Sequence, residues 1–196
     1  MAGLKIGVLG GTFDPIHNAH LLLAEQAREQ LQLDRVLFIP AGDPWRKASR
    51  RVAPAQHRLA MTRLAIDGVA GFVVDDCEVT REGPSYTADT VRELHDRYKR
   101  DELFLLLGED ALADLPFWHE PESIAENATI VVAPRGGVVL PELPFDANRI
   151  VRIKMPFLDI SSTDLRDRAR HGKSLRYLVP DVVAEYIREH KVYGPI

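Results

Sequence analysis

Residues 5–20 read KIGVLGGTFDPIHNAH, and this stretch decides the fold. Its first five residues are mostly apolar and predict a buried strand that ends at Leu9. The paired glycines Gly10 and Gly11 follow, and they let the backbone approach a ligand closely. A helical pattern begins near His20, and the amides of a helix N-terminus attract anions. The stretch therefore predicts a strand, a loop suited to phosphate and a helix.

The same order of strand and helix recurs along the rest of the chain. Short β-branched or leucine-rich runs predict strands at residues 5–9, 36–39, 72–74, 103–107, 129–132 and 151–155. Apolar-rich patterns at helical spacing include Leu23, Ala27 and Leu31; Thr87, Val91, Leu94 and Tyr98; and Val183, Tyr186, Ile187 and His190. The alternation predicts an α/β fold, with a Rossmann-like, doubly wound and mostly parallel sheet covered by helices on both faces. Such sheets bind ligands beyond the carboxyl ends of their strands.

Length and composition narrow the class of protein. The chain has 196 residues, 45% of them hydrophobic, and we expect one domain spanning residues 1–196. The 25 Lys and Arg against 29 Asp and Glu give a net charge of −4, which argues against a nucleic-acid partner. The single cysteine excludes an internal disulfide, and no apolar run approaches the roughly 20 residues of a membrane helix. We therefore expect a cytoplasmic protein without a membrane partner, and a homo-oligomer stays open.

Two common nucleotide-binding motifs do not match this sequence. The dinucleotide fingerprint needs three glycines spaced G-x-G-x-x-G and an acid ending the second strand, where Ile39 is followed by Pro40. A P-loop would need a glycine where Asp167 stands, five residues before Gly172. The mismatches argue against a nicotinamide-dependent oxidoreductase and against a P-loop enzyme.

His17 and His20 stand three residues apart at the predicted helix start, which places both imidazoles on one face. A coincidence at the helix cap and half of a zinc site are the alternatives. Zinc, however, normally takes three or four ligands, and neither a cysteine partner nor a His-Glu-x-x-His motif is present. Imidazoles can donate hydrogen bonds to phosphoryl oxygens. We expect the pair to contact a phosphate, and we expect no metal-binding residues.

A second helix start follows the last predicted strand, where residues 160–166 read ISSTDLR. Serine and threonine at this place are typical helix caps, and capping alone is one interpretation. The functional interpretation adds Arg166, one turn into the helix, so that hydroxyls, amides and a guanidinium converge on an anion. Two such helix starts in one sheet indicate a polyphosphate ligand.

The stretch GGTFDP at residues 10–15, followed by HNAH at residues 17–20, resembles the nucleotidyltransferase superfamily with the signature His-x-Gly-His. Within it, the chain resembles the nicotinate mononucleotide adenylyltransferases. Ala19 departs from the usual glycine and could tighten the space beside the α-phosphate. The resemblance implies that catalysis rests on His17 and His20, which would bridge the α-phosphate. It also implies that ATP is bound by Gly10, Gly11, Thr12, Phe13, Ser161, Ser162 and Arg166.

Residues 84–90, which read PSYTADT, are similar to the element by which this family binds the pyridine carboxylate through backbone amides, here near Tyr86 and Thr87. A plain turn and helix start is the alternative. The resemblance further implies that Lys47 reaches phosphates, that Asp110 positions a ribose and that Trp118 stacks on the pyridine, although core packing is the alternative for Trp118. His119 and Arg135 complete the residues that the resemblance implies for the mononucleotide.

The resemblance implies adenylyl transfer from ATP, with Mg²⁺, to nicotinate mononucleotide, giving nicotinate adenine dinucleotide and pyrophosphate. Because the attacking phosphate is already ionised, the protein would need to position and neutralise rather than to supply a base. A sibling transferase acting on nicotinamide mononucleotide or phosphopantetheine is one alternative. A nucleotide sensor that binds ATP without releasing pyrophosphate is another.

Overall fold

The computed structural model describes residues 3–45, 52–134, 142–146 and 150–194. The strands are β1 (Lys5–Gly11), β2 (Arg35–Pro40), β3 (Phe72–Val74), β4 (Glu102–Gly108), β5 (Thr129–Ala133) and β6 (Ile150–Arg152). The α-helices are α1 (Asn18–Leu31), α2 (Ala55–Ile66), α3 (Cys77–Thr80), α4 (Thr87–Arg97), α5 (Glu109–Asp114), α6 (Pro121–Asn127), α7 (Ser162–Arg170) and α8 (Asp181–Glu189), and a 3₁₀ turn, η2 (Leu115–Phe117), follows α5. The expected α/β class is confirmed.

The strands form one parallel sheet in the order β3-β2-β1-β4-β5-β6. Val8 of β1 is paired with Leu37 of β2 on one side and with Leu105 of β4 on the other. The chain therefore winds outward from β1 in one direction, returns, and winds outward from β4 in the other. The crevice between the ends of β1 and β4 is the switch point at which such sheets bind ligands.

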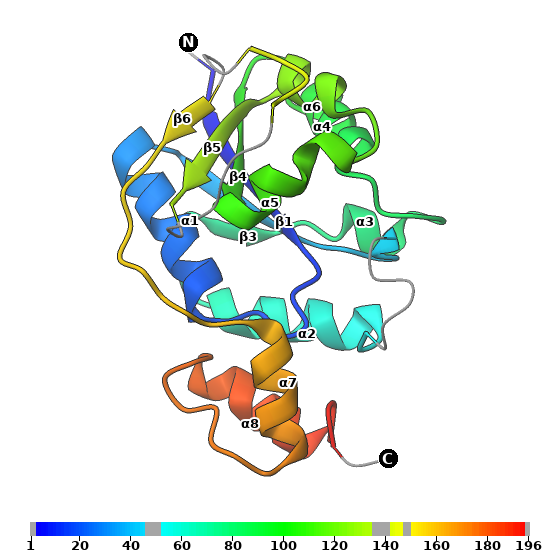
Figure 1. The fold of residues 1–196 in the computed structure, drawn as a ribbon, viewed down its shortest axis with the longest axis vertical. Helices are drawn as coiled ribbons and strands as arrows, with labels where there is room; N and C mark the ends of the chain where they lie inside the picture. Colours follow the sequence, from blue (N-terminus) through cyan, green and yellow to red (C-terminus); the bar gives the residue numbers. More distant parts are fainter. Residues whose placement is uncertain (1–2, 46–51, 135–141, 147–149, 195–196) are drawn as a thin grey trace.

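Both faces of the sheet are apolar, as the doubly wound prediction requires. In β4, Phe104 and Leu106 face one core cluster, while Leu103, Leu105 and Leu107 face the other. The first cluster is covered by α1, α2, α7 and α8, and the second by α4, α5 and α6. Each fully buried leucine stabilises the fold by roughly 1.5–3 kcal/mol. Figure 1 shows α7 and α8 at the end of the molecule away from the N-terminus, where α8 packs against α2.

The last strand is shorter than the sequence predicts. The prediction of 151–155 is wrong beyond Arg152, although the amide of Ile153 still donates to the carbonyl of Val132. The side-chain amide of Gln30 then takes over both backbone groups of Lys154, accepting from its N–H at 2.9 Å and donating to its carbonyl at 2.6 Å. The chain thereby leaves the sheet, and Met155 is directed toward a cavity instead.

The predicted surface loop at residues 134–148 falls largely outside the described residues. Among the residues that the structure describes, none of the helices combines the length and the apolar character needed to cross a membrane.

Candidate active site

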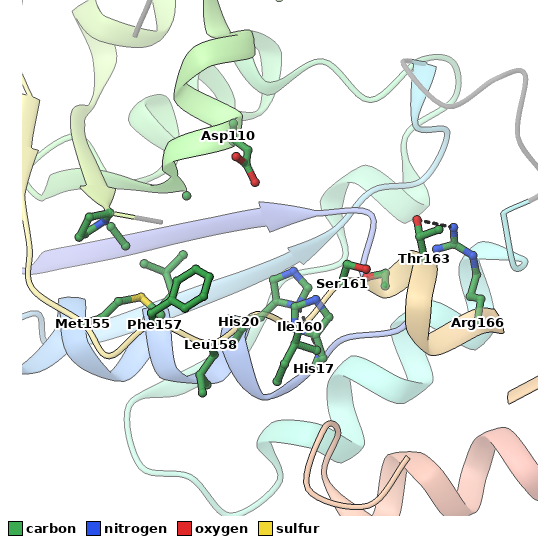
Figure 2. Close-up of a pocket in the computed structure, with 17 residues that line it drawn as sticks. His17, His20, Asp110, Met155, Phe157, Leu158, Ile160, Ser161, Thr163 and Arg166 are labelled. Carbon is green, nitrogen blue, oxygen red and sulfur yellow. Dashed lines mark hydrogen bonds between the residues drawn. The ribbon is translucent and has the colours of Figure 1, made fainter. Parts of the chain in front are cut away.

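A cavity of about 320 Å³ opens at the carboxyl ends of the central strands, where the switch point predicts a ligand (Figure 2). Segments distant in the sequence meet there. The lining residues are His17, Ala19, His20 and Leu23 at α1; Gly108, Asp110 and Ala111 at the β4–α5 junction; Ala133 and Pro134 after β5; Met155, Phe157, Leu158 and Ile160 after β6; and Ser161, Ser162, Thr163 and Arg166 at α7.

The two histidines lie together at the start of α1. His17 is the N-cap residue and is 5% exposed, and its ring stacks on that of His20 with centroids 3.7 Å apart. The backbone N–H of His17 donates to Nδ1 of His20 at 3.2 Å. Because Nδ1 accepts this bond, a neutral His20 carries its proton on Nε2. His20 can therefore present a hydrogen-bond donor on the side of its ring opposite to the backbone contact.

The ring of Phe13 packs against the ring of His20. Phe13 is 2% exposed, and its ring meets the His20 ring edge-on, with centroids 5.1 Å apart. A Cβ at Gly11 would lie 2.8 Å from Cε1 of Phe13, so only glycine leaves room for this ring. Gly10, Gly11, Thr12 and Phe13 are not among the residues lining the cavity. Their assignment to ATP stays a prediction.

The start of α7 faces the same cavity (Figure 2). Ser161 caps the helix, because its Oγ accepts a hydrogen bond from the amide of Asp164 at 3.1 Å. Ser162 donates its hydroxyl to the carbonyl of Pro15 at 3.1 Å, which ties α7 to the loop after β1. Arg166 donates to the carbonyl of Asp14 at 2.9 Å and to Oγ1 of Thr163 at 3.1 Å. Capping and anion binding are thus compatible, since the capped helix start and Arg166 line one cavity.

Asp110 approaches the cavity from α5, on the other side of β1 from α7 (Figure 2). Its neighbour Glu109 is 9% exposed, and one of its carboxylate oxygens lies 3.9 Å from Nη1 of Arg152. Among the described residues lining the cavity, Asp110 is the only carboxylate.

A second group of predicted residues gathers outside the cavity lining. Tyr86 stacks on His119 with ring centroids 4.3 Å apart, and Trp45 meets Tyr86 at 5.5 Å. We call Trp45, Tyr86 and His119 the aromatic cluster. Sequence reasoning assigned no role to Trp45, because a lone tryptophan in a loop carries no signal of its neighbours. Trp118 is half-buried and packs against the second core cluster, so its packing interpretation has structural support.

The loop beneath the aromatic cluster is anchored by Ser85. Its Oγ accepts from the amides of Gly42 at 2.9 Å and Asp43 at 3.2 Å. The amide of Tyr86 donates to the carbonyl of Pro84 at 3.1 Å, so a ligand carboxylate would have to compete for it. Thr87 is the first residue of α4, and the first amides of a helix have no partner within the helix. A carboxylate would therefore be met mainly by the start of α4.

Arg58 connects the loop that leads to the cavity with the loop beneath the aromatic cluster. The sequence analysis did not identify it. It is 1% exposed, and its guanidinium donates to the carbonyls of Thr12 at 2.8 Å, Ala41 at 2.5 Å and Gly42 at 2.9 Å. Burial lowers the pKa of Arg58, and the nearby Asp14 carboxylate opposes that shift. One buried side chain thus fixes the loops after both β1 and β2. Sequence pattern alone says nothing of these distant carbonyls.

Two predicted residues, Lys47 and Arg135, lie outside the described residues, so their positions stay predictions. Among the described residues, no group of three or more histidine, cysteine, aspartate or glutamate side chains is placed to hold a metal ion.

Known proteins resemble the chain over nearly its whole length. The family model "Cytidylyltransferase-like" matches residues 8–168. A Roseiflexus protein named "probable nicotinate-nucleotide adenylyltransferase" is 49% identical over 98% of this chain and 100% of its own, and one of the same name from Thermomicrobium roseum is 45% identical over 98% and 92%.

The fold is also found among solved structures. That of Plasmodium falciparum nicotinic acid mononucleotide adenylyltransferase, complexed with NaAD, has a TM-score of 0.79 and covers 97% of both chains at 18% identity. At 18% identity this similarity supports the fold alone, whereas the family assignment depends on the relatives of 45% and 49% identity. The chain belongs to the cytidylyltransferase-like family and, within it, to the nicotinate-nucleotide adenylyltransferases.

Proposed function

We propose that this chain transfers the adenylyl group of ATP to nicotinate mononucleotide, giving nicotinate adenine dinucleotide and pyrophosphate, a step in NAD synthesis. The observation that carries the proposal is the convergence of two helix starts, α1 with His20 and α7 with Arg166, on one cavity. Helix N-termini and a guanidinium suit a polyphosphate. The names of relatives at 45–49% identity support the choice of the second substrate.

The reaction needs no base from the protein. A phosphate oxygen of the mononucleotide, ionised at pH 7, forms a bond to the α-phosphorus of ATP, and the bond from that phosphorus to the bridging oxygen breaks. The electron pair leaves with pyrophosphate. Catalysis of this kind depends on in-line placement of the reactants and on stabilising the charge that develops.

His20 serves the α-phosphate in this proposal. Its Nδ1 accepts from the His17 amide, so a neutral ring carries its proton on Nε2, which would donate to a non-bridging oxygen of the phosphate. His17 stacks on His20 and fixes the plane of its ring. A donor held in place before the reaction costs no reorganisation when charge develops in the transition state.

Arg166 and the first amides of α7 serve the β- and γ-phosphates and then the departing pyrophosphate. Magnesium prefers oxygen ligands and is typically held by substrate phosphates with one or two carboxylates. Among the described residues the cavity lining offers one carboxylate, Asp110, which this proposal assigns to a ribose, so the ion would reach the site mainly on the triphosphate. When bound, Mg²⁺ neutralises triphosphate charge.

The mononucleotide is assigned to the region of the aromatic cluster. The start of α4 at Thr87 offers amides to the pyridine carboxylate, and Trp118 and His119 offer ring faces to the pyridine. Lys47 and Arg135 complete this assignment.

The test is pyrophosphate release by the purified protein with ATP and Mg²⁺. Separate reactions contain nicotinate mononucleotide, nicotinamide mononucleotide, phosphopantetheine or no acceptor. We expect release to require an acceptor and to be fastest with nicotinate mononucleotide. Pyrophosphate release only with phosphopantetheine would assign a sibling activity. ATP binding without pyrophosphate release in any of the reactions would indicate a nucleotide sensor.

A further inference from the structure

Asp14 is a buried carboxylate directly behind the cavity, and the proposed reaction gives it no role. It is 2% exposed. Its Oδ1 accepts from the hydroxyl of Tyr193 at 2.7 Å and from the amide of Ala53 at 3.3 Å, while Oδ2 lies 3.7 Å from Nη1 of Arg166. Buried carboxylates are costly unless they are paired and hydrogen-bonded. Asp14 meets that requirement by joining three segments distant in the sequence.

The contact between Asp14 and Arg166 fixes the orientation of the Arg166 guanidinium. The guanidinium is planar with five N–H donors in a rigid fork, so two occupied donors determine where the others point. Arg166 uses Nη1 for the carbonyl of Asp14 and Nη2 for the hydroxyl of Thr163. Its side chain is 14% exposed, and it lines the cavity. The backbone and carboxylate of Asp14 thus set the orientation in which Arg166 meets a ligand.

Tyr193 in turn fixes the carboxylate. It is 6% exposed, and its hydroxyl is 179 residues from Asp14 in the sequence. Burial raises the pKa of Tyr193, and the charge of Asp14 raises it further. The phenol therefore stays protonated at neutral pH and donates its hydrogen bond to Asp14.

We propose that Asp14 and Tyr193 are a pair of positioning residues that hold Arg166 in the orientation that receives pyrophosphate. This inference rests on the proposed function. Neither residue touches the reacting atoms, since both act through Arg166. Without the pair, the side chain of Arg166 would become ordered only when the ligand binds. The free-energy cost of that ordering would weaken the binding of phosphate.

Tyr193→Phe tests the proposal, because it removes one oxygen and keeps the buried ring. We expect kcat/KM for ATP to fall about tenfold, equivalent to about 1.4 kcal/mol, while KM for nicotinate mononucleotide stays unchanged. Tyr186→Phe is the matched control. It removes a hydroxyl that lies 2.9 Å from Nδ1 of His57 rather than on the carboxylate of Asp14, and it should leave both constants unchanged. Circular dichroism and thermal melting establish that each variant is folded at the assay temperature.

A double-mutant cycle with Arg166→Ala separates positioning from general destabilisation. If Tyr193 acts through Arg166, Tyr193→Phe should cost about tenfold in the parent protein and less than about twofold in the Arg166→Ala protein. Asp14→Asn should behave like Tyr193→Phe, because it keeps an oxygen for the tyrosine and removes the charge facing Arg166. Independent, additive losses, or an unchanged Tyr193→Phe enzyme, would overturn the proposal.

Calorimetric titration with inorganic pyrophosphate provides a readout independent of turnover. Tyr193→Phe should weaken pyrophosphate binding about tenfold, and the same change in the Arg166→Ala background should have almost no effect. An inactive parent protein that shows this binding pattern would refute the proposed function and leave the positioning pair supported. An active parent protein without the pattern would refute the pair alone.

Discussion

Arg166 at the cavity is 14% exposed and held by two hydrogen bonds, whereas His119 in the aromatic cluster is 44% exposed and stacks on one ring. The cavity is tied together by directional polar contacts between distant segments. The aromatic cluster is held by ring contacts above an anchored loop. The difference follows from the two tasks, because charge that shifts during a reaction needs donors fixed beforehand, while an aromatic ring can be bound by adjustable surfaces.

Each region also contains a buried carboxylate, and the two are satisfied differently. Asp14 faces an arginine and a tyrosine hydroxyl. Glu78, which is 6% exposed, accepts the hydroxyl of Thr90 at 2.7 Å, and burial raises its pKa. The first carboxylate orients a cation at the cavity. The second holds the start of α4 beneath the aromatic cluster, and its raised pKa makes the stability of the protein depend on pH.

The largest effect is expected at the cavity, from His20→Asn. The asparagine oxygen can still accept the amide of His17, but no donor remains at the position of Nε2. We expect kcat to fall by about 10²-fold or more, as for loss of one preorganised donor, and His20→Ala to cost at least as much. Steady-state pyrophosphate release measures both.

His171→Asn is the control, since His171 is exposed at the end of α7 and also uses its Nδ1 for a backbone contact. Normal turnover of His20→Asn would show that the stacked pair only caps α1.

The next largest effect is substrate preference in the region of the aromatic cluster. Amides at the start of α4 suit a carboxylate, whose two oxygens both accept, whereas a carboxamide must turn its NH₂ toward a donor. We expect kcat/KM for nicotinate mononucleotide to exceed that for nicotinamide mononucleotide by about 10²-fold. The comparison is made at fixed ATP and Mg²⁺. Equal values would remove the carboxylate assignment and leave adenylyl transfer standing.

A smaller effect is expected from Trp118→Ala. Stacking contributes equally to the ground state and the transition state, so KM for the mononucleotide should rise about tenfold with little change in kcat or in KM for ATP. Phe117→Ala, which removes an adjacent aromatic ring that is 70% exposed, is the control. A lowered melting temperature with normal KM would identify Trp118 as a packing residue only.

The smallest effect concerns the response of stability to pH through Glu78. Because its native pKa is raised above the ordinary 4.5, the native state binds this proton more tightly than the unfolded state. The resulting stabilisation is present below the ordinary pKa and is lost as the pH rises through the native pKa.

Glu78→Gln stays neutral, so its melting temperature relative to the parent should rise with pH across that interval. Each kcal/mol corresponds to about 2–4 °C in a chain of this size. Glu126→Gln, an exposed carboxylate, should keep a constant difference from the parent. A constant difference for Glu78→Gln as well would contradict the raised pKa.

Much of the fold could be predicted from the sequence, because the pattern of β4 is local and unambiguous. The buried run from Leu103 to Leu107 has both faces apolar, so it predicts a central parallel strand. The end of β6 could not be predicted, since the backbone of Lys154 is bound outside the sheet by Gln30, 124 residues earlier.

The candidate site was predicted to a lesser degree. Sequence motifs indicate His17, His20 and Arg166, because each of these residues lies within a few positions of a predicted helix start. They do not indicate Arg58 or Tyr193, whose partners are backbone carbonyls or a carboxylate brought near by the fold. The stacking of Tyr86 on His119 was not visible either, since each residue belongs to a separate motif.

The bond between Asp14 and Tyr193 also determines when the site is completed during synthesis. The two residues are 179 positions apart, and domains fold as the chain emerges N-terminal end first. At about 5–20 residues per second, roughly 10–40 s separate the emergence of the carboxylate from that of its donor. In the interval, β1 can pair with β2 and Asp14 can meet the amide of Ala53, but the carboxylate still lacks the hydroxyl of Tyr193. The earliest loop of this protein to be synthesised is therefore among the last to reach its final form.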